Sequence, residues 1–113
     1  IPGHLNQVFM NLLLNGVQAI QGEGNIWIKT NLDKSWVIIK IRDDGKGIEE
    51  KELNKIFDPF YSTKPVGEGT GLGLSISYGI VEKHNGLILV ESEAGKGTTF
   101  TIKIPAEKGK SDE

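Results

Sequence analysis

The sequence of 113 residues predicts an α+β protein, a two-layer α/β sandwich in which helices cover one face of a mixed, mostly antiparallel sheet. Two segments, residues 5–20 and 71–84, carry apolar residues at helical spacing. Two further stretches, residues 26–43 and 87–104, each contain a pair of strand-like segments around a short turn. Hydrophobic residues make up 37% of the chain, which at this length is enough for one compact domain.

The first half of the chain is expected to form one helix and two strands. The helix covers residues 5–20, where these apolar side chains recur at helical spacing: Leu5, Phe9, Leu12, Leu13 and Ile20. The strands cover residues 26–32 and 36–43 and are joined at Asp33-Lys34-Ser35. This half therefore contributes one helix and one strand pair.

The second half is expected to begin with a long irregular segment. Its elements are a helical turn over residues 49–56, a loop over 57–70, a helix over 71–84, and strands over 87–92 and 98–104. Gly86 stops the helix, and Gly95-Lys96-Gly97 joins the last two strands. Loops as long as 57–70 are usually functional lids or disordered segments, and residues 106–113 form a charged tail.

The composition excludes several classes of protein. The net charge of −2 gives no electrostatic signature of nucleic-acid binding, and the absence of cysteine excludes disulfide scaffolds and thiolate chemistry. No apolar run approaches the roughly 20 residues of a transmembrane helix. We therefore expect a soluble, cytoplasmic and monomeric domain with no nucleic-acid partner and no direct membrane contact.

Glycine occupies four alternate positions before the second helix: Gly67, Gly69, Gly71 and Gly73. Successive N–H groups around glycine form anion-binding concavities, and a helix N-terminus adds unpaired donors, so this loop is suited to holding phosphate. The stretch matches neither the P-loop nor the dinucleotide-binding fingerprint. A flexible loop that simply ends at a helix therefore remains an equal alternative.

The first helix is unusual because residues 1–22 contain no Asp, Glu, Lys or Arg. Amide side chains lie along one stripe instead: Gln7, Asn11, Asn15 and Gln18. Asn11 and Asn15 are one turn apart, so their side chains project together. They are candidate neutral oxygen ligands for a cation or a polar ligand. The alternative is a buried helix whose amides make hydrogen bonds in the core.

Asp43 is predicted to point toward the core. On its strand, alternation places these side chains on one face: Val37, Ile39, Ile41 and Asp43. A carboxylate is rarely buried without a partner, and Gly45 and Gly47 let the backbone turn close beside whatever Asp43 holds. The alternative is an Asp-Gly turn capped by Asp43. Thr98 is also directed inward, where a threonine bonded to backbone is the default interpretation.

Together these features resemble the ATP-binding catalytic domain of sensor histidine kinases, part of the GHKL group of gyrase, heat-shock chaperone, histidine kinase and mismatch-repair ATPases. The N box resembles residues 6–20, "NQVFMNLLLNGVQAI", and the DxGxG box resembles residues 43–47. The remaining matches are "IFDPFYSTK", "GTGLGLS" and "GKGTTFTIKIP". Five motifs in the right order across residues 4–105 are specific, and they imply the Bergerat fold.

The resemblance implies that ATP and Mg²⁺ are the cofactors. It assigns Asn15 to the metal ion, Asn11 to a neighbouring polar contact, and Asp43 to the adenine amino group, with Thr98 near the adenine. The expected nucleotide-binding residues are Asn11, Asn15, Asp43, Gly45, Gly47, Ile48, Phe57, Lys64, Gly69, Thr70, Gly71, Leu72, Gly73, Leu74 and Thr98. The glycines would line the phosphates and let a lid move.

The lid implied by the resemblance runs from about residue 58 to residue 70, with Phe57 and Phe60 anchoring its ends. Many relatives carry a lysine and an aromatic residue where this sequence has Gln18 and Ala19. One phosphate-binding cation and one adenine-stacking ring are therefore missing. Lys64 in the lid is the expected replacement for the cation.

The resemblance also implies a division of labour between domains. Residues 1–105 would form the catalytic domain, without the helical dimerisation domain that carries the phospho-accepting histidine, and residues 106–113 would be a tail. His4 and His84 lie at helix ends and are interpreted as structural. The phosphoryl group would pass to a histidine on the helical domain and then to a response regulator. The resemblance fits a membrane-anchored full-length kinase and a soluble one equally.

Three alternative functions remain. ATP hydrolysis is disfavoured because the hydrolytic relatives carry a glutamate base where this chain has Asn11. A serine kinase of the anti-sigma type shares the nucleotide-binding fold and stays open. A nucleotide-binding module without catalysis is disfavoured by the combination of Asn15, Asp43 and the glycine box.

Overall fold

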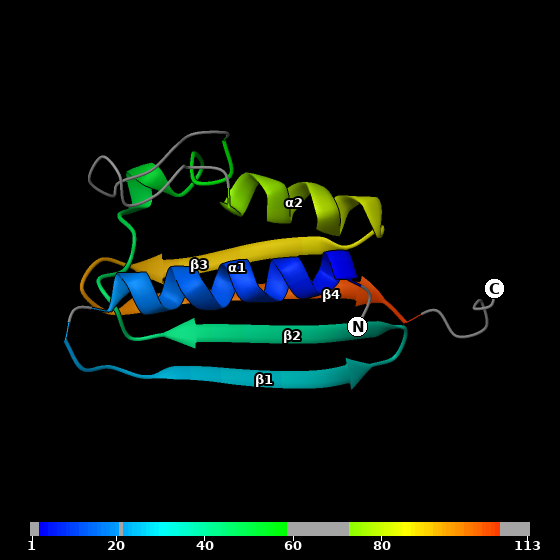
Figure 1. The fold of residues 1–113 in the computed structure, drawn as a ribbon, viewed down its shortest axis with the longest axis horizontal. Coiled ribbons are helices and arrows are strands. Elements are labelled where there is room, and N and C mark those ends of the chain that lie inside the picture. Colours follow the sequence, from blue (N-terminus) through cyan, green and yellow to red (C-terminus); the bar gives the residue numbers. More distant parts are fainter. Residues whose placement is uncertain (1–2, 21, 59–72, 107–113) are drawn as a thin grey trace.

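The computed structural model describes residues 3–20, 22–58 and 73–106. Its elements are α1 (Gly3–Ala19), β1 (Ile26–Asp33), β2 (Trp36–Asp43), the short 3-10 helix η1 (Glu50–Glu52), α2 (Gly73–Lys83), β3 (Leu87–Glu93) and β4 (Gly97–Pro105). The predicted fold class is confirmed (Figure 1). Of the helical turn predicted over residues 49–56, only η1 is regular helix.

The sheet joins the two strand pairs through their later strands. The strand order is β1-β2-β4-β3, and each neighbouring pair is antiparallel. β4, the last strand in the chain, therefore lies between β2 and β3. Its register places Thr98 directly opposite Asp43 at the end of β2, so the topology brings together two inward-facing polar residues that are far apart in the sequence.

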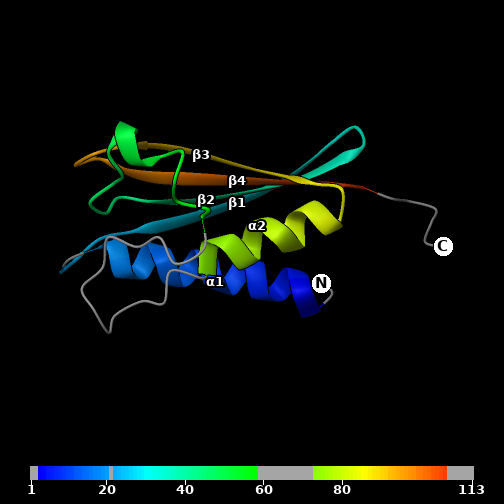
Figure 2. The same cartoon turned by 90° about the horizontal axis from the view of Figure 1, so that it is seen from above.

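The two longer helices form the second layer, and both lie on the same face of the sheet (Figure 2). Apolar side chains from both layers form the core: Val8, Leu12, Ile41, Ile56, Val81, Ile88, Phe100 and Ile102. Val8 and Leu12 are one turn apart and are almost completely buried, whereas Phe9 and Leu13 are only partly buried. The buried stripe of α1 is therefore centred one residue earlier than the periodicity of the sequence indicated.

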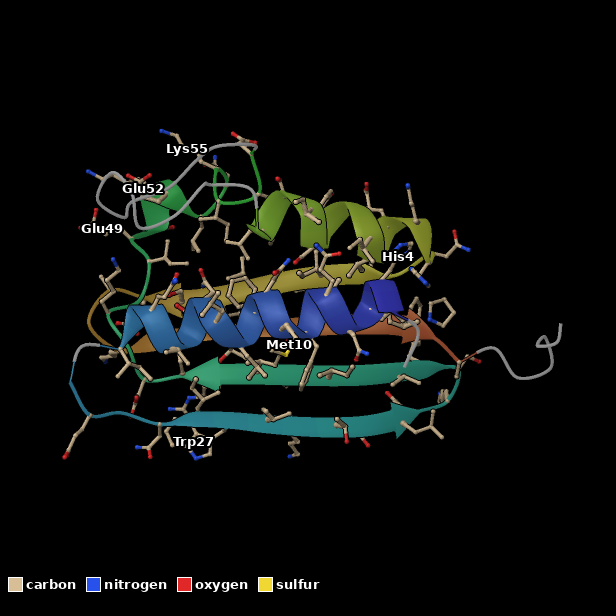
Figure 3. All side chains as sticks on the ribbon, in the orientation of Figure 1. His4, Met10, Trp27, Glu49, Glu52 and Lys55 are labelled. Carbon is tan, nitrogen blue, oxygen red and sulfur yellow. The ribbon has the colours of Figure 1, made fainter. Side chains whose placement is uncertain are left out.

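A second apolar stripe on α1 is exposed. Met10 is 61% exposed and projects from the side of α1 that faces away from α2 (Figure 3), and Leu14 and Val17 are also exposed. Ile28 and Leu32 of β1 are exposed as well and lie opposite core-facing residues of β2. Part of α1 and β1 is thus an uncovered apolar surface. None of the described helices is long and apolar enough to cross a membrane.

A cavity of about 190 Å³ lies between the first half of α1 and the strands β2 and β4. It is lined by Leu5, Val8, Phe9, Val37, Ile39, Ile102 and Ile104. Val37 and Ile39 lie in the first half of β2, whereas Asp43 is its last residue, so the cavity is separate from the polar residues singled out in the sequence.

Candidate functional site

Asp43 is buried at the end of β2, as its strand parity predicts. The residue is 3% exposed, and its Oδ1 accepts a hydrogen bond of 2.8 Å from the N–H of Gly45. Burial raises the pKa of its carboxyl above the ordinary 3.8, although the N–H groups of Gly45 and Thr98 act in the opposite direction. Within the described segments, Asp43 has no cationic partner. The turn-capping and inward-facing interpretations both apply.

The other carboxylate oxygen of Asp43 faces α1. A Cβ built on Gly16 would lie 3.6 Å from Oδ2 of Asp43 and 3.3 Å from Cδ1 of Ile26. Gly16 directly follows Asn15. Because Asp43 approaches the backbone of α1 closely at Gly16, it lies next to the helix turn that carries Asn15. Sequence reasoning did not single out Gly16, although a glycine in a helix interior, where it costs about 1 kcal/mol relative to alanine, was an available signal.

The glycines of the DxGxG box are required by close packing of the backbone. A Cβ on Gly45 would lie 2.5 Å from the carbonyl oxygen of Ala19 at the end of α1. Gly47 has φ +73°, and its Cβ would collide with the carbonyl oxygen of Glu93. The turn is also tied down by hydrogen bonds from Lys46 to Ala19 and from Gly95 to Lys46. The end of α1 and the β3–β4 turn therefore hold the loop that follows Asp43.

Thr98 belongs to a network of hydroxyl groups centred on Ser92. Oγ of Ser92 donates to the carbonyl of Gly97 at 2.8 Å and accepts from the N–H of Ile48 at 2.8 Å. Since the single proton of Ser92 is used, Thr98 is the donor in its 2.8 Å contact with Ser92. The default expectation of a bond from Thr98 to backbone is therefore wrong. Ser92, which sequence reasoning missed, connects Thr98 to Ile48.

Asn11 joins α1 to α2. Its Nδ2 lies 3.3 Å from the carbonyl oxygen of Gly73 and 3.2 Å from Oγ of Ser77. This arrangement corresponds to the alternative interpretation, in which an amide of α1 makes hydrogen bonds inside the protein. The half-buried side chain of Asn15 makes no hydrogen bond to any other described residue. The two asparagines thus differ: one is engaged by α2, and the other is bonded to no described side chain or backbone group.

Phe57 and the start of α2 lie beside this helix contact. The ring of Phe57 is 5.2 Å from the ring of Tyr78 and 6.5 Å from that of Phe100, centroid to centroid. Leu74 packs partly buried against the core. Among the described residues, a Cβ on Gly73 would approach only Cγ of Asn11, at 4.0 Å. No described neighbour therefore requires glycine at this position.

The remaining predicted ligands lie outside the described residues: Lys64, Gly69, Thr70, Gly71 and Leu72, and so does Phe60, the predicted anchor of the lid. Their roles, and the lid to which most of them belong, stay predictions. Of the two histidines, His4 is exposed on the first turns of α1 (Figure 3), and Nδ1 of His84 lies 2.9 Å from the carbonyl oxygen of Ile80. In the described segments, no group of three or more His, Asp or Glu side chains is arranged to hold a metal ion.

Comparison with curated proteins places the site in a family context. The chain is 45% identical over 117 residues to sporulation kinase E of Bacillus subtilis, covering 99% of the chain and 16% of the relative. It is 44% identical over 111 residues to the sensor histidine kinase ZraS of Escherichia coli, covering 98% of the chain and 23% of the relative. The chain thus spans less than a quarter of the length of either relative.

Solved structures agree with this comparison. The catalytic domain of the histidine kinase ThkA superimposes with a TM-score of 0.80 at 36% identity, covering 91% of this chain and 66% of that one. The mycobacterial sensor histidine kinase MprB gives 0.81 at 27% identity, covering 90% and 72%. A family model described as histidine kinase-, DNA gyrase B- and HSP90-like ATPase matches residues 1–108. The resemblance carried by the five motifs is confirmed, and the chain belongs to this family of ATPase-like domains.

Proposed function

We propose that this chain is the ATP-binding catalytic domain of a two-component sensor kinase. It binds Mg-ATP and transfers the γ-phosphoryl group to a histidine on a separate helical dimerisation domain, from which a response regulator takes it. The family match and the kinase names of the relatives support the assignment. In this proposal residues 1–105 are the catalytic domain and residues 106–113 are a tail.

The observation that carries the proposal is the buried Asp43 carboxylate. A buried anion without a cationic partner is costly, so a ligand that donates a hydrogen bond to it gains affinity. The exocyclic amine of adenine is such a donor. Guanine carries a carbonyl oxygen at the same position, and that oxygen would leave two acceptors facing each other. Asp43 therefore selects adenine, and Thr98 lies beside it on β4.

The phosphate end of the site is formed by α1 and the start of α2. Asn15 offers a neutral amide oxygen, and oxygen ligands suit Mg²⁺, which takes its other ligands from phosphates and water. When bound, the metal ion neutralises charge on the phosphates. The first N–H groups of a helix have no partner within the helix, so the N-terminus of α2 would offer them to a phosphate, and no described atom lies closer than 4.0 Å to a Cβ on Gly73. The residues thus act by positioning and by charge stabilisation.

The acceptor is a histidine of another domain. His84 is engaged by the carbonyl of Ile80, and His4 lies near the start of α1, whereas Asn15 lies near its end. Hydrolysis is not favoured, because the amide of Asn11 cannot act as a base for water. We therefore expect the chain alone to bind Mg-ATP with only trace phosphate release.

Calorimetric titration with Mg-ATP and Mg-GTP tests the proposal. Mg-ATP should bind at least about thirtyfold more tightly, because guanine leaves two buried acceptors unpaired at a cost of about 1–3 kcal/mol each. Asp43→Asn should weaken Mg-ATP binding. The control is Asp44→Asn, since Asp44 is exposed and bonded to Asn25, and it should bind normally. Equal affinities for the two nucleotides would exclude Asp43 as the adenine-selecting group.

A labelling experiment tests the transfer step. With the helical domain added in trans, Mg-ATP labelled at the γ-phosphate should give an acid-labile phosphohistidine, and Asn15→Ala should abolish it. An acid-stable phosphoserine on a partner would indicate the serine-kinase branch instead. Rapid phosphate release by the chain alone would contradict the kinase assignment.

A further inference from the structure

Three groups form a small hydrogen-bonded network between α1 and α2, which we call the helix latch: the side chain of Asn11, the side chain of Ser77 and the carbonyl of Gly73. Nδ2 of Asn11 lies 3.3 Å from the Gly73 oxygen and 3.2 Å from Oγ of Ser77. Oγ of Ser77 lies 2.9 Å from the same Gly73 oxygen. Ser77 is completely buried, so water does not substitute for these partners.

The direction of each hydrogen bond in the helix latch follows from the chemistry of the groups. A backbone carbonyl only accepts, so the Asn11 atom beside Gly73 is the amide nitrogen and not the oxygen. The single proton of Ser77 goes to Gly73, so Ser77 accepts from Asn11. The two acceptors are only 2.9 Å apart, so they lie in nearly the same direction from Nδ2 and share one of its N–H groups. The latch therefore engages one N–H of Asn11 and fixes the orientation of its side-chain amide.

The helix latch connects the two parts of the proposed phosphate site. Asn11 precedes Asn15 by one turn on the same face of α1. Gly73 is the first residue of α2, and Ser77 is one turn further along. The network therefore sets how far the N–H groups at the start of α2 lie from the amide of Asn15, and how they are turned toward it.

We propose that Asn11 and Ser77 are positioning residues that fix the N-terminal turn of α2 relative to Asn15. This inference rests on the proposed function, because it concerns the phosphates of a bound nucleotide. In this proposal the backbone N–H groups of α2 recognise phosphate, and the latch holds them at the distance that binding needs. Ser77 acts through α2 without touching the nucleotide, and adenosine, which lacks phosphates, does not depend on the latch.

The test compares Ser77→Ala with Val81→Ala by calorimetry. Val81 is equally buried one turn later in α2, so its truncation loosens packing without touching the helix latch. Ser77→Ala should lower the affinity for Mg-ATP about tenfold relative to that for adenosine, which corresponds to about 1.4 kcal/mol. Val81→Ala should leave this ratio unchanged, and Ser77→Thr, which keeps the hydroxyl, should restore it. Asn11→Leu, which is neutral, of similar size and unable to donate, should behave like Ser77→Ala and serves if the alanine variant does not fold.

Nuclear magnetic resonance gives a second readout that needs no nucleotide. The Nδ2 proton of Asn11 that is directed at Gly73 and Ser77 should exchange with water about tenfold more slowly than those of Asn6, an exposed asparagine of the same helix, and Ser77→Ala should reduce the difference. Equal exchange of the two asparagines in the unmodified chain would overturn the helix latch.

Failure of the positioning role and failure of the proposed function give different results. If the unmodified chain binds Mg-ATP and Ser77→Ala keeps the wild-type ratio of Mg-ATP to adenosine affinity, the positioning role is refuted and the proposed function stands. If the unmodified chain binds no adenine nucleotide, the proposed function is refuted, and the positioning role with it, even when the protons of Asn11 are protected.

Discussion

The glycines near Asp43 and the glycine that begins α2 occupy opposite kinds of surroundings. Around Asp43, a Cβ on Gly45 would overlap the carbonyl oxygen of Ala19, one on Gly47 that of Glu93, and one on Gly97 that of Asp43. At the start of α2, a Cβ on Gly73 would lie 4.0 Å from its nearest described neighbour. Glycine is needed by the fold in the first region, whereas no described protein atom requires it in the second.

This difference separates two reasons for glycine that look alike in a sequence. The DxGxG box lets three backbone segments meet closely, and this packing holds Asp43 in place. The glycine at the start of α2 leaves open space beside a helix N-terminus, where an anion would be held. A substitution in the first region should therefore cost stability, and one in the second should cost binding.

Gly97→Ala is expected to have the largest effect. Gly97 has φ +114°, where alanine is strained, and the added Cβ would overlap the carbonyl of Asp43, so the free energy of unfolding should fall by about 3 kcal/mol or more. Urea denaturation measures the change. Gly95→Ala in the same turn is the control, because Gly95 also has positive φ but has no neighbour within 4 Å, and it should cost only about 1–2 kcal/mol. Equal losses would show that the close approach is unimportant.

Gly73→Ala should reverse the pattern. Since the site has room for a methyl group, the free energy of unfolding should be unchanged or slightly raised, while the affinity for Mg-ATP should fall about tenfold, or ~1.4 kcal/mol. Gly79→Ala, inside the same helix with no neighbour within 4 Å, should stabilise by about 0.5–1 kcal/mol and leave binding unaltered. Calorimetry and thermal melting of both variants check this. Unchanged Mg-ATP binding by Gly73→Ala would mean that no ligand uses the open space.

The smallest effects are expected for Asp43 and Asp44, the adjacent carboxylates at the end of β2. Their contributions to the free energy of unfolding should change in opposite directions with pH. Burial raises the pKa of Asp43, so its contribution to stability is complete below 3.8 and is lost as pH rises through the raised value. Hydrogen bonds from Asn25 lower the pKa of Asp44, so its contribution is present above 3.8 and is lost as pH falls through the lowered value. Relative to the wild type, Asp43→Asn should gain stability as pH rises from 3 to 7, and Asp44→Asn should lose it. Urea denaturation across this range measures both, and parallel profiles would contradict the inward placement of Asp43.

The sequence by itself determined every regular element of the described fold and its approximate ends. Periodicity identified α1 and α2, alternation identified the strands, and the parity of β2 directed Asp43 inward, because these patterns depend only on helix and strand geometry. The order of five motifs determined the family, which the comparisons confirm.

Only the tertiary structure decided which groups pair with which. The contacts between Asn11 and Ser77 and between Ser92 and Ile48 join residues 66 and 44 positions apart, and no local pattern specifies such partners. The same holds for the buried stripe of α1, because the placement of the helix on the sheet selected Val8 and Leu12 over their apolar neighbours. The glycines were visible in the sequence, but the backbone atoms that exclude a side chain at Gly47 and Gly97 come from other strands and turns. Long-range packing alone supplies those atoms, and so it alone distinguishes the glycines whose backbone is closely packed from Gly73, which no described atom approaches closely.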